Sequence, residues 1–124
     1  GEFTGHWVCI WIDKDRDVIC FFDAYGLAPD AEMPYSPYVL NNLGPYLSQL
    51  LQKDKRPIDY NPYQLQKWSS GVATCGRWCA VRLKFKHLNH KQFHKLFQNN
   101  KLDNDMVITY LSFMVNDEEK LKLE

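Results

Sequence analysis

The first 23 residues constrain the fold most, because they have the pattern of one β-hairpin. Residues 6–12 and 17–23 are rich in β-branched, aromatic and cysteine residues, and the polar segment 13–16 between them supplies a turn. If Ile12 pairs with Asp17 across that turn, His6 lies opposite Asp23, and Cys9 lies opposite Cys20. Directly opposed antiparallel residues have Cβ atoms roughly 4.5–5.5 Å apart. An imidazole–carboxylate hydrogen bond between His6 and Asp23 is therefore expected.

After the hairpin the pattern becomes mixed. Residues 24–37 carry one glycine and three prolines and predict an irregular loop, and leucines between 43 and 51 recur at helical spacing. Residues 57–66 suggest short extended pieces. Helices are expected from Cys75 to about Lys86, around 91–98 and around 105–114, with Thr74 as the first N-cap and a charged C-terminus that frays. These elements predict a single α+β domain over residues 1–124.

Composition and charge exclude several classes of function. Hydrophobic residues make up 45% of the chain, which is typical of a globular protein. Fifteen basic and fifteen acidic residues cancel, so charge gives no support for a nucleic-acid partner or an anionic membrane surface. No stretch approaches the ~20 apolar residues of a membrane span. Four cysteines in a neutral chain of this size favour a reducing compartment, so we expect Cys9 and Cys20 to remain thiols.

The residue types required for thiol catalysis occur in the chain order His6, Asp23, Cys75. A thiol nucleophile needs a base, and the base needs a third group that fixes its tautomer. Cys75 begins a predicted helix, where the free amides and the dipole stabilise an anion, and its own amide can donate to an oxyanion. Simpler roles stay open, namely a buried structural cysteine for Cys75 and an ordinary cross-strand pair for His6 and Asp23.

Two other groupings are weaker. His87, His90 and His94 share one side of a predicted helix, but no cysteine or carboxylate completes a zinc pattern nearby. A solvated stripe is favoured, and we predict no metal and no cofactor. Cys75 and Cys79 are separated by three residues instead of the two of thioredoxin-like motifs, and Cys79 is expected to pack in the core.

Taken together, these residues resemble the adenovirus-protease-like and ubiquitin-like-protein-protease families of cysteine peptidases. The resemblance covers most of the chain, and a later Asp105-x-Val107 helix start is common in versions from large DNA viruses and virophages. The order histidine, acid, cysteine separates these families from papain-like and transglutaminase-like enzymes, which place the cysteine first. The matching pieces are Gly5-His6-Trp7, Phe21-Phe22-Asp23-Ala24-Tyr25-Gly26, Gln66 and Thr74-Cys75-Gly76-Arg77-Trp78-Cys79.

The resemblance implies a permuted papain-like fold, in which a mixed sheet packs against a central helix that begins at the nucleophile. It implies that Cys75 is the nucleophile, His6 the general base and Asp23 the group that orients it. It also implies that Gln66 and the Cys75 amide form the oxyanion hole. Trp7 would help to roof a narrow groove that favours glycine and other small residues beside the scissile bond.

Two features of the chain differ from the family pattern. Gln66 precedes Cys75 by nine residues, whereas the family's glutamine lies about six or seven residues before the cysteine, so Trp68 and Ser69 are alternative oxyanion donors. Family members also carry a segment before the histidine that completes the groove. Only five residues precede His6 here, which fits either a truncated chain or a compact member.

The leading hypothesis is a viral cysteine endopeptidase that matures capsid or core precursors in the virion or the host-cell cytoplasm. Its partners would be a protein or peptide substrate and, as in adenovirus, an activating peptide; no membrane is implicated. An effector-type acetyltransferase shares the residue order and would transfer acetyl groups from acetyl-CoA. A non-catalytic binding domain of the same fold is the third class, and an inert Cys75 would indicate it.

Overall fold

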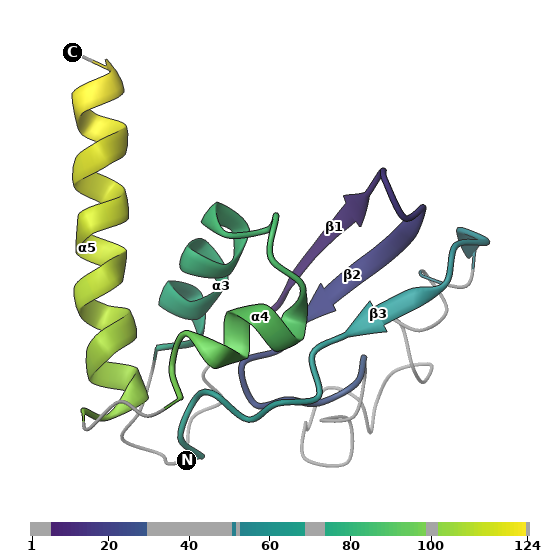
Figure 1. Cartoon of the computed structure of the whole chain (residues 1–124), viewed down its shortest axis with the longest axis horizontal. Helices are drawn as coiled ribbons and strands as arrows, with labels where there is room; N and C mark the ends of the chain where they lie inside the picture. The colour runs from purple at the N-terminus through teal and green to yellow at the C-terminus, as the bar shows by residue number, and fades with distance from the viewer. Residues whose placement is uncertain (1–5, 30–50, 52, 69–73, 99–101, 124) are drawn as a thin grey trace, which may run out of the picture.

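The computed structural model describes residues 6–29, 51, 53–68, 74–98 and 102–123. These residues form a three-stranded mixed sheet and three helices (Figure 1), which confirms the predicted α+β class. Residues 30–37 of the predicted loop at 24–37, and nearly all of the predicted helix at 43–51, lie outside the described residues. The elements are, in chain order, β1 (Cys9–Asp13), β2 (Val18–Phe22), β3 (Ile58–Tyr60), α3 (Cys75–Lys84), α4 (His90–Lys95) and α5 (Asn104–Leu123).

The hairpin is present, but its register differs from the predicted one by two residues. Cys9 pairs with Phe22 and Asp13 with Val18, so the predicted Ile12–Asp17 and Cys9–Cys20 pairs are wrong. The cause is Asp13, whose Oδ1 accepts hydrogen bonds from the amides of the two residues 15 and 16, at 3.1 and 3.2 Å. The turn therefore starts one residue later, and Asp17 ends it with a φ of 55°. A shift of two residues leaves every side chain on its predicted face.

The third strand joins the sheet in parallel. Ile58 pairs with Ile19 and Tyr60 with Phe21, which places β2 in the centre of the order β1-β2-β3. The predicted extended region at 57–66 thus contains only three strand residues. The central strand β2 is buried from Ile19 to Phe22, so side chains on both of its faces are covered.

The helices begin close to where the sequence predicts and end elsewhere. α3 starts at Cys75, and Thr74 occupies its N-cap position without the predicted cap, since its side chain makes no capping hydrogen bond. α4 starts with a capping box made by Asn89 and Gln92. α5 continues to Leu123, so the predicted end at 114 is wrong. Glutamate, lysine and leucine dominate 118–123, and these are strong helix formers.

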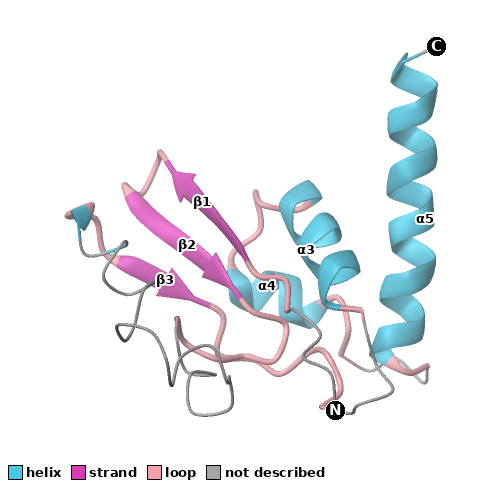
Figure 2. Ribbon diagram, turned by 180° about the vertical axis from the view of Figure 1, so that it is seen from behind, coloured by secondary structure: helices cyan, strands magenta, loops and turns pink. Residues whose placement is uncertain are grey.

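The helices lie to one side of the sheet, with α3 between the sheet and α5 (Figures 1 and 2). Phe93 of α4 packs edge to face on Phe22 of β2 at a centroid distance of 5.8 Å and on Trp78 of α3 at 6.4 Å, so one aromatic ring connects the sheet to both helices. Within the described residues, no helix has the length and apolarity needed to cross a membrane. The core cluster comprises Cys9, Phe22, Ala24, Leu65, Trp78, Cys79, Val81, Phe93, Phe97 and Ile108.

Candidate functional site

His6 and Asp23 meet at one end of the hairpin. His6 lies just before β1 and Asp23 just after β2, and Nε2 of His6 is 2.9 Å from Oδ1 of Asp23. In the observed register Val8 would continue the ladder opposite Asp23, so His6 reaches the carboxylate diagonally, a contact within range of long side chains. The predicted hydrogen bond is therefore present although the predicted register is wrong.

The surroundings of Asp23 fix both members of this pair. Oδ1 of Asp23 also accepts the Tyr25 amide at 2.8 Å, and the Asp23 carbonyl accepts Nδ2 of buried Asn61 at 2.9 Å. The Tyr25 ring stacks on the His6 imidazole, with a centroid distance of 4.7 Å and an interplanar angle of 16°. If Asp23 is ionised, its carboxylate only accepts hydrogen bonds, and the 2.9 Å contact then assigns to neutral His6 the tautomer with the proton on Nε2 and a basic Nδ1.

Cys75 is the first residue of α3, and the structure places it beside the His6–Trp7 segment. The Trp7 backbone amide donates to Sγ of Cys75 at 3.4 Å, so the thiol lies against the peptide bond that joins His6 to Trp7. The Trp7 indole covers the neighbouring helix residue, since a Cβ added to Gly76 would lie 3.4 Å from Cδ1 of Trp7. The outer side of Trp7 remains exposed. His6, Trp7, Asp23 and Cys75 are thus brought together as the sequence predicts.

Gln66 lies beside this group and is 1% exposed. Its backbone amide donates to the Ala24 carbonyl at 2.9 Å, which holds it against the end of β2. Its Nε2 lies 3.4 Å from the Tyr25 hydroxyl, and its Oε1 is buried without a hydrogen-bond partner among the described atoms. Of the two alternative donors, Trp68 is exposed and packs on the Tyr25 ring at 4.4 Å. Ser69 lies outside the described residues.

A glycine lets the Gln66 segment pass close to the end of β2. Gly26 has a φ of 77°, and a Cβ at this position would lie 2.6 Å from the Tyr63 carbonyl carbon. Such a separation is far below any ordinary contact, and positive φ is costly for other residues. The glycine of the Phe21–Gly26 motif is therefore required by the close approach of residues 63–64.

Sequence reasoning identified Asp105 only as a helix start, and its structural role is larger. The side chain is buried, and Oδ2 accepts the Lys67 amide at 2.9 Å. Oδ1 accepts the Trp78 indole N–H at 3.0 Å and the Thr74 hydroxyl. A single carboxylate thus joins the segment of Gln66 to the start of α3. The sequence signal was limited to an aspartate in a first helical turn, which ordinarily indicates capping.

The other three cysteines are buried thiols in the structure. Cys79 lies against Cys9, and hydrogen bonding to that thiol together with burial raises the pKa of Cys79. Burial, reinforced by the charge of Asp59, raises the pKa of Cys20. Because thiolates are the reactive form, these environments suppress reaction at Cys79 and Cys20 near neutral pH. Cys75 is more exposed than the other three.

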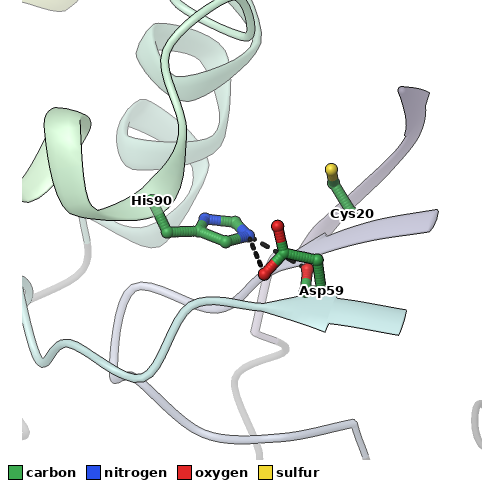
Figure 3. Close-up of side chains that lie close together, drawn as sticks. All are labelled: Cys20, Asp59 and His90. Carbon is green, nitrogen blue, oxygen red and sulfur yellow. Dashed lines mark hydrogen bonds and ion pairs between the residues drawn. The ribbon is translucent and has the colours of Figure 1, made fainter. Parts of the chain in front are cut away.

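Cys20, Asp59 and His90 also lie close together (Figure 3), with candidate ligand atoms within 4.8 Å of one another. The space between two of them is taken by a cation of the chain itself, because the Arg16 guanidinium contacts Oδ2 of Asp59 at 3.0 Å and Sγ of Cys20 at 3.7 Å. Nε2 of His90 lies 3.0 Å from the Asp59 carbonyl oxygen. We assign this group to a structural polar network instead of a metal centre.

The same contacts correct the predicted histidine stripe. His90 is 6% exposed, and burial lowers its pKa, so it is not a solvated surface residue. His94 stacks on Tyr63 with a centroid distance of 4.1 Å, and His87 is exposed. The three histidines therefore lie in three different environments and do not share one solvated face.

The fold and the site define a small α+β protein with a histidine, an aspartate and a cysteine grouped where a hairpin meets a helix start. The chain is a homologue of the Sputnik virophage protein named "Uncharacterized protein V9", with 40% identity over 73% of this chain and 54% of the relative. The predicted viral character is thereby confirmed as virophage-related. The chain spans about half the length of the curated relative it matches. No family model matches the chain, and no solved structure matches it.

Proposed function

We propose that this chain is a cysteine endopeptidase that cleaves beside small, glycine-rich residues and processes viral capsid or core precursors. The single observation that carries the proposal is the junction of β1 and α3. There two neighbouring residues contact the other two members of the site. His6 is hydrogen-bonded to Asp23 at 2.9 Å, and the backbone amide of the next residue, Trp7, contacts Sγ of Cys75 at 3.4 Å. A thiol and an oriented base are the components that nucleophilic thiol catalysis requires, and a helix N-terminus further stabilises the thiolate.

In the proposed reaction the Cys75 thiol transfers its proton to Nδ1 of His6, and Sγ attacks the scissile carbonyl carbon. The charge of Asp23 stabilises the imidazolium that forms, and the hydrogen bond at Nε2 keeps the ring in the correct tautomer. The imidazolium then gives its proton to the departing amine as the carbon–nitrogen bond breaks. Water, activated by neutral His6, releases the acyl group from Cys75 and restores the thiol.

The tetrahedral intermediate places negative charge on the former carbonyl oxygen. The Cys75 backbone amide, free at the start of α3, supplies one donor. Gln66 supplies the second donor if its amide group is turned so that Oε1 accepts from the Tyr25 hydroxyl. Turning the Gln66 amide by half a turn exchanges Nε2 and Oε1 without changing the shape of the side chain. Nε2 then occupies the position at which Oε1 has no hydrogen-bond partner. A buried donor without a partner is costly, and an incoming oxyanion would satisfy it.

Two observations support the choice of substrate. The Trp7 indole lies over Gly76, beside the nucleophile, so bulky side chains next to the scissile bond would meet the ring. The homologue is a virophage protein, which supports a viral precursor as the substrate and the virion or the infected cell as the place of action.

The test is covalent labelling with a peptide vinyl sulfone ending in Gly-Gly, followed by mass mapping of the modified residue. We expect modification of Cys75 in the native protein, none in Cys75→Ala, and slower reaction of a matched probe ending in Leu-Leu. Cys79→Ser is the matched control, since it removes a thiol one helical turn away. Equal labelling of all four thiols, or an inert Cys75, would refute the proposal.

The oxyanion assignment has its own test. Gln66→Ala should lower the turnover of a Gly-Gly peptide amide by roughly 10²–10³ with little change in KM. Near-normal turnover in Gln66→Ala, together with a large loss in Trp68→Phe or Ser69→Ala, would transfer the role to that residue. Acetyl transfer from acetyl-CoA without peptide cleavage would instead identify an acetyltransferase.

A further inference from the structure

We propose that Asp105 is a positioning residue that sets the distance between the two halves of the oxyanion hole. This inference rests on the proposed function, because it assigns Gln66 and the Cys75 amide to that hole. Asp105 would act through its neighbours and would not touch the substrate.

The contacts of Asp105 connect both halves directly. Oδ2 accepts the amide of Lys67, the residue after Gln66, at 2.9 Å. Oδ1 accepts the hydroxyl of Thr74, the residue before Cys75, and the indole N–H of Trp78 at 3.0 Å. One rigid carboxylate group therefore lies between the residues adjacent to the two oxyanion donors.

The chain path alone gives little control over that distance. Gln66 and Cys75 are nine residues apart in the sequence, and a connection of that length is compatible with many separations of its ends. A carboxylate bound on both sides replaces this freedom by fixed hydrogen-bond lengths. Because a misplacement of about 1 Å can cost on the order of 10²-fold in rate, such a clamp has a direct kinetic consequence.

The side chain of Asp105 bonds to another part of the chain instead of capping its own helix. An aspartate in a first turn usually accepts amides of the same helix, whereas the three donors to this carboxylate described above belong to residues 67–78. The start of α5 is served by Asp103, whose Oδ1 accepts the Asp105 amide at 2.8 Å. Asp103→Asn keeps an oxygen that can accept the Asp105 amide and leaves the Asp105 carboxylate unchanged, so it is a matched control that removes a charge at the same helix start.

The choice of substitution follows from the number of acceptors. The variant Asp105→Asn would keep the volume of the side chain but replace one acceptor oxygen by an NH₂ donor, so at least one of the three contacts must break. Thr74→Val removes a single contact and keeps the shape of the side chain. It provides a second variant in case Asp105→Asn does not fold.

The experiment compares two reactions of Cys75 in the same protein. Hydrolysis of a Gly-Gly peptide aminomethylcoumarin passes through an oxyanion, whereas alkylation by iodoacetamide does not. We expect Asp105→Asn to lower kcat for the peptide by roughly 10–100-fold and to change the alkylation rate less than about threefold. Thr74→Val should show a smaller loss of the same kind, and Asp103→Asn should behave as wild type.

A double-mutant cycle with Gln66→Ala separates positioning from a general structural role. If Asp105 positions Gln66, Asp105→Asn should cause little further loss once Gln66 has been removed. Losses that multiply, or equal losses in both reactions, would refute the inference and leave the proposed function intact. A wild-type protein that alkylates at Cys75 but hydrolyses no peptide would refute the proposed function, and the inference with it.

Discussion

The charge of Asp23 is the feature whose removal tests the site most directly. Asparagine preserves the shape of the side chain and can still accept the Tyr25 amide, a contact of 2.8 Å in the structure. Because Oδ1 contacts both the Tyr25 amide and Nε2 of His6, this orientation presents a neutral oxygen to His6. The turned orientation gives up the Tyr25 contact and presents an NH₂ donor. A donor at Nε2 forces the other tautomer, in which Nδ1 carries the proton and cannot take one from Cys75.

The magnitude follows from the burial of the pair. Opposite unit charges about 4 Å apart interact by roughly 4 kcal/mol at an effective dielectric constant of about 20. The side chains of His6 and Asp23 are 16% and 3% exposed, so solvent screens the interaction only partly. We take about 2–3 kcal/mol as the stabilisation of protonated His6 that Asp23→Asn removes, which corresponds to a rate lower by roughly 30–150-fold.

The assay is alkylation of Cys75 by iodoacetamide at neutral pH, because it depends on the base and not on substrate binding. Asp23→Asn should react roughly 30–150-fold more slowly than wild type, by the same estimate. Asp59→Asn is the matched control, since Asp59 lies against His90 but away from Cys75, and its alkylation rate should be unchanged. A rate within about twofold of wild type in folded Asp23→Asn would show that His6 and Asp23 do not activate this thiol.

Three further predictions concern stability, each measured by urea unfolding. Gly26→Ala should lose at least about 2 kcal/mol of unfolding free energy, because positive φ and the 2.6 Å approach to Tyr63 both oppose a Cβ. Gly76→Ala, the control, should lose less than about 1 kcal/mol. Similar losses in the two variants would contradict the described geometry. Arg82→Met should lose about 2–4 kcal/mol, since the buried guanidinium donates to two backbone carbonyls at 2.8 Å and burial lowers its pKa only to about 10; a loss under about 0.5 kcal/mol would refute this. Burial depresses the pKa of His90, so the unfolded chain binds the proton first as the pH falls below 6.5. The free energy of unfolding should therefore decrease below that pH by up to about 1.4 kcal/mol per pH unit. An equal slope in His90→Gln would exclude this residue as the cause.

Much of the site could be predicted because the error in the hairpin register is an even number of residues, so each side chain stays on its predicted face of the sheet. The predicted turn was displaced by one residue, since the Asp13 side chain holds the first turn amides in a way that a polar run does not reveal. The resulting register shift is two residues, which keeps His6 and Asp23 on one face. The contact between His6 and Asp23 was therefore predictable although the backbone partner assigned to each strand residue was wrong.

Contacts between distant segments could not be predicted in the same way. β3 is only three residues long, and nothing in its sequence indicates that it pairs in parallel with β2. Asp105 resembles any acidic residue of a first helical turn, and its partners come from another part of the chain. His90 was misjudged because helical periodicity gives the side of a helix but not whether a neighbouring strand covers it.

The parallel strand has a consequence for the order in which the protein folds. The pair Cys9–Phe22 closes a short hairpin, whereas Ile19–Ile58 joins residues three times as far apart along the chain. Local contacts form faster than distant ones, because less chain entropy is lost before the contact is made. We expect the hairpin, and with it the two segments that carry His6 and Asp23, to form before β3 and α3 dock. Under the proposed function, the Cys75 thiol would reach His6 only in the last steps, so a refolding chain would form the hairpin before it gained a reactive cysteine.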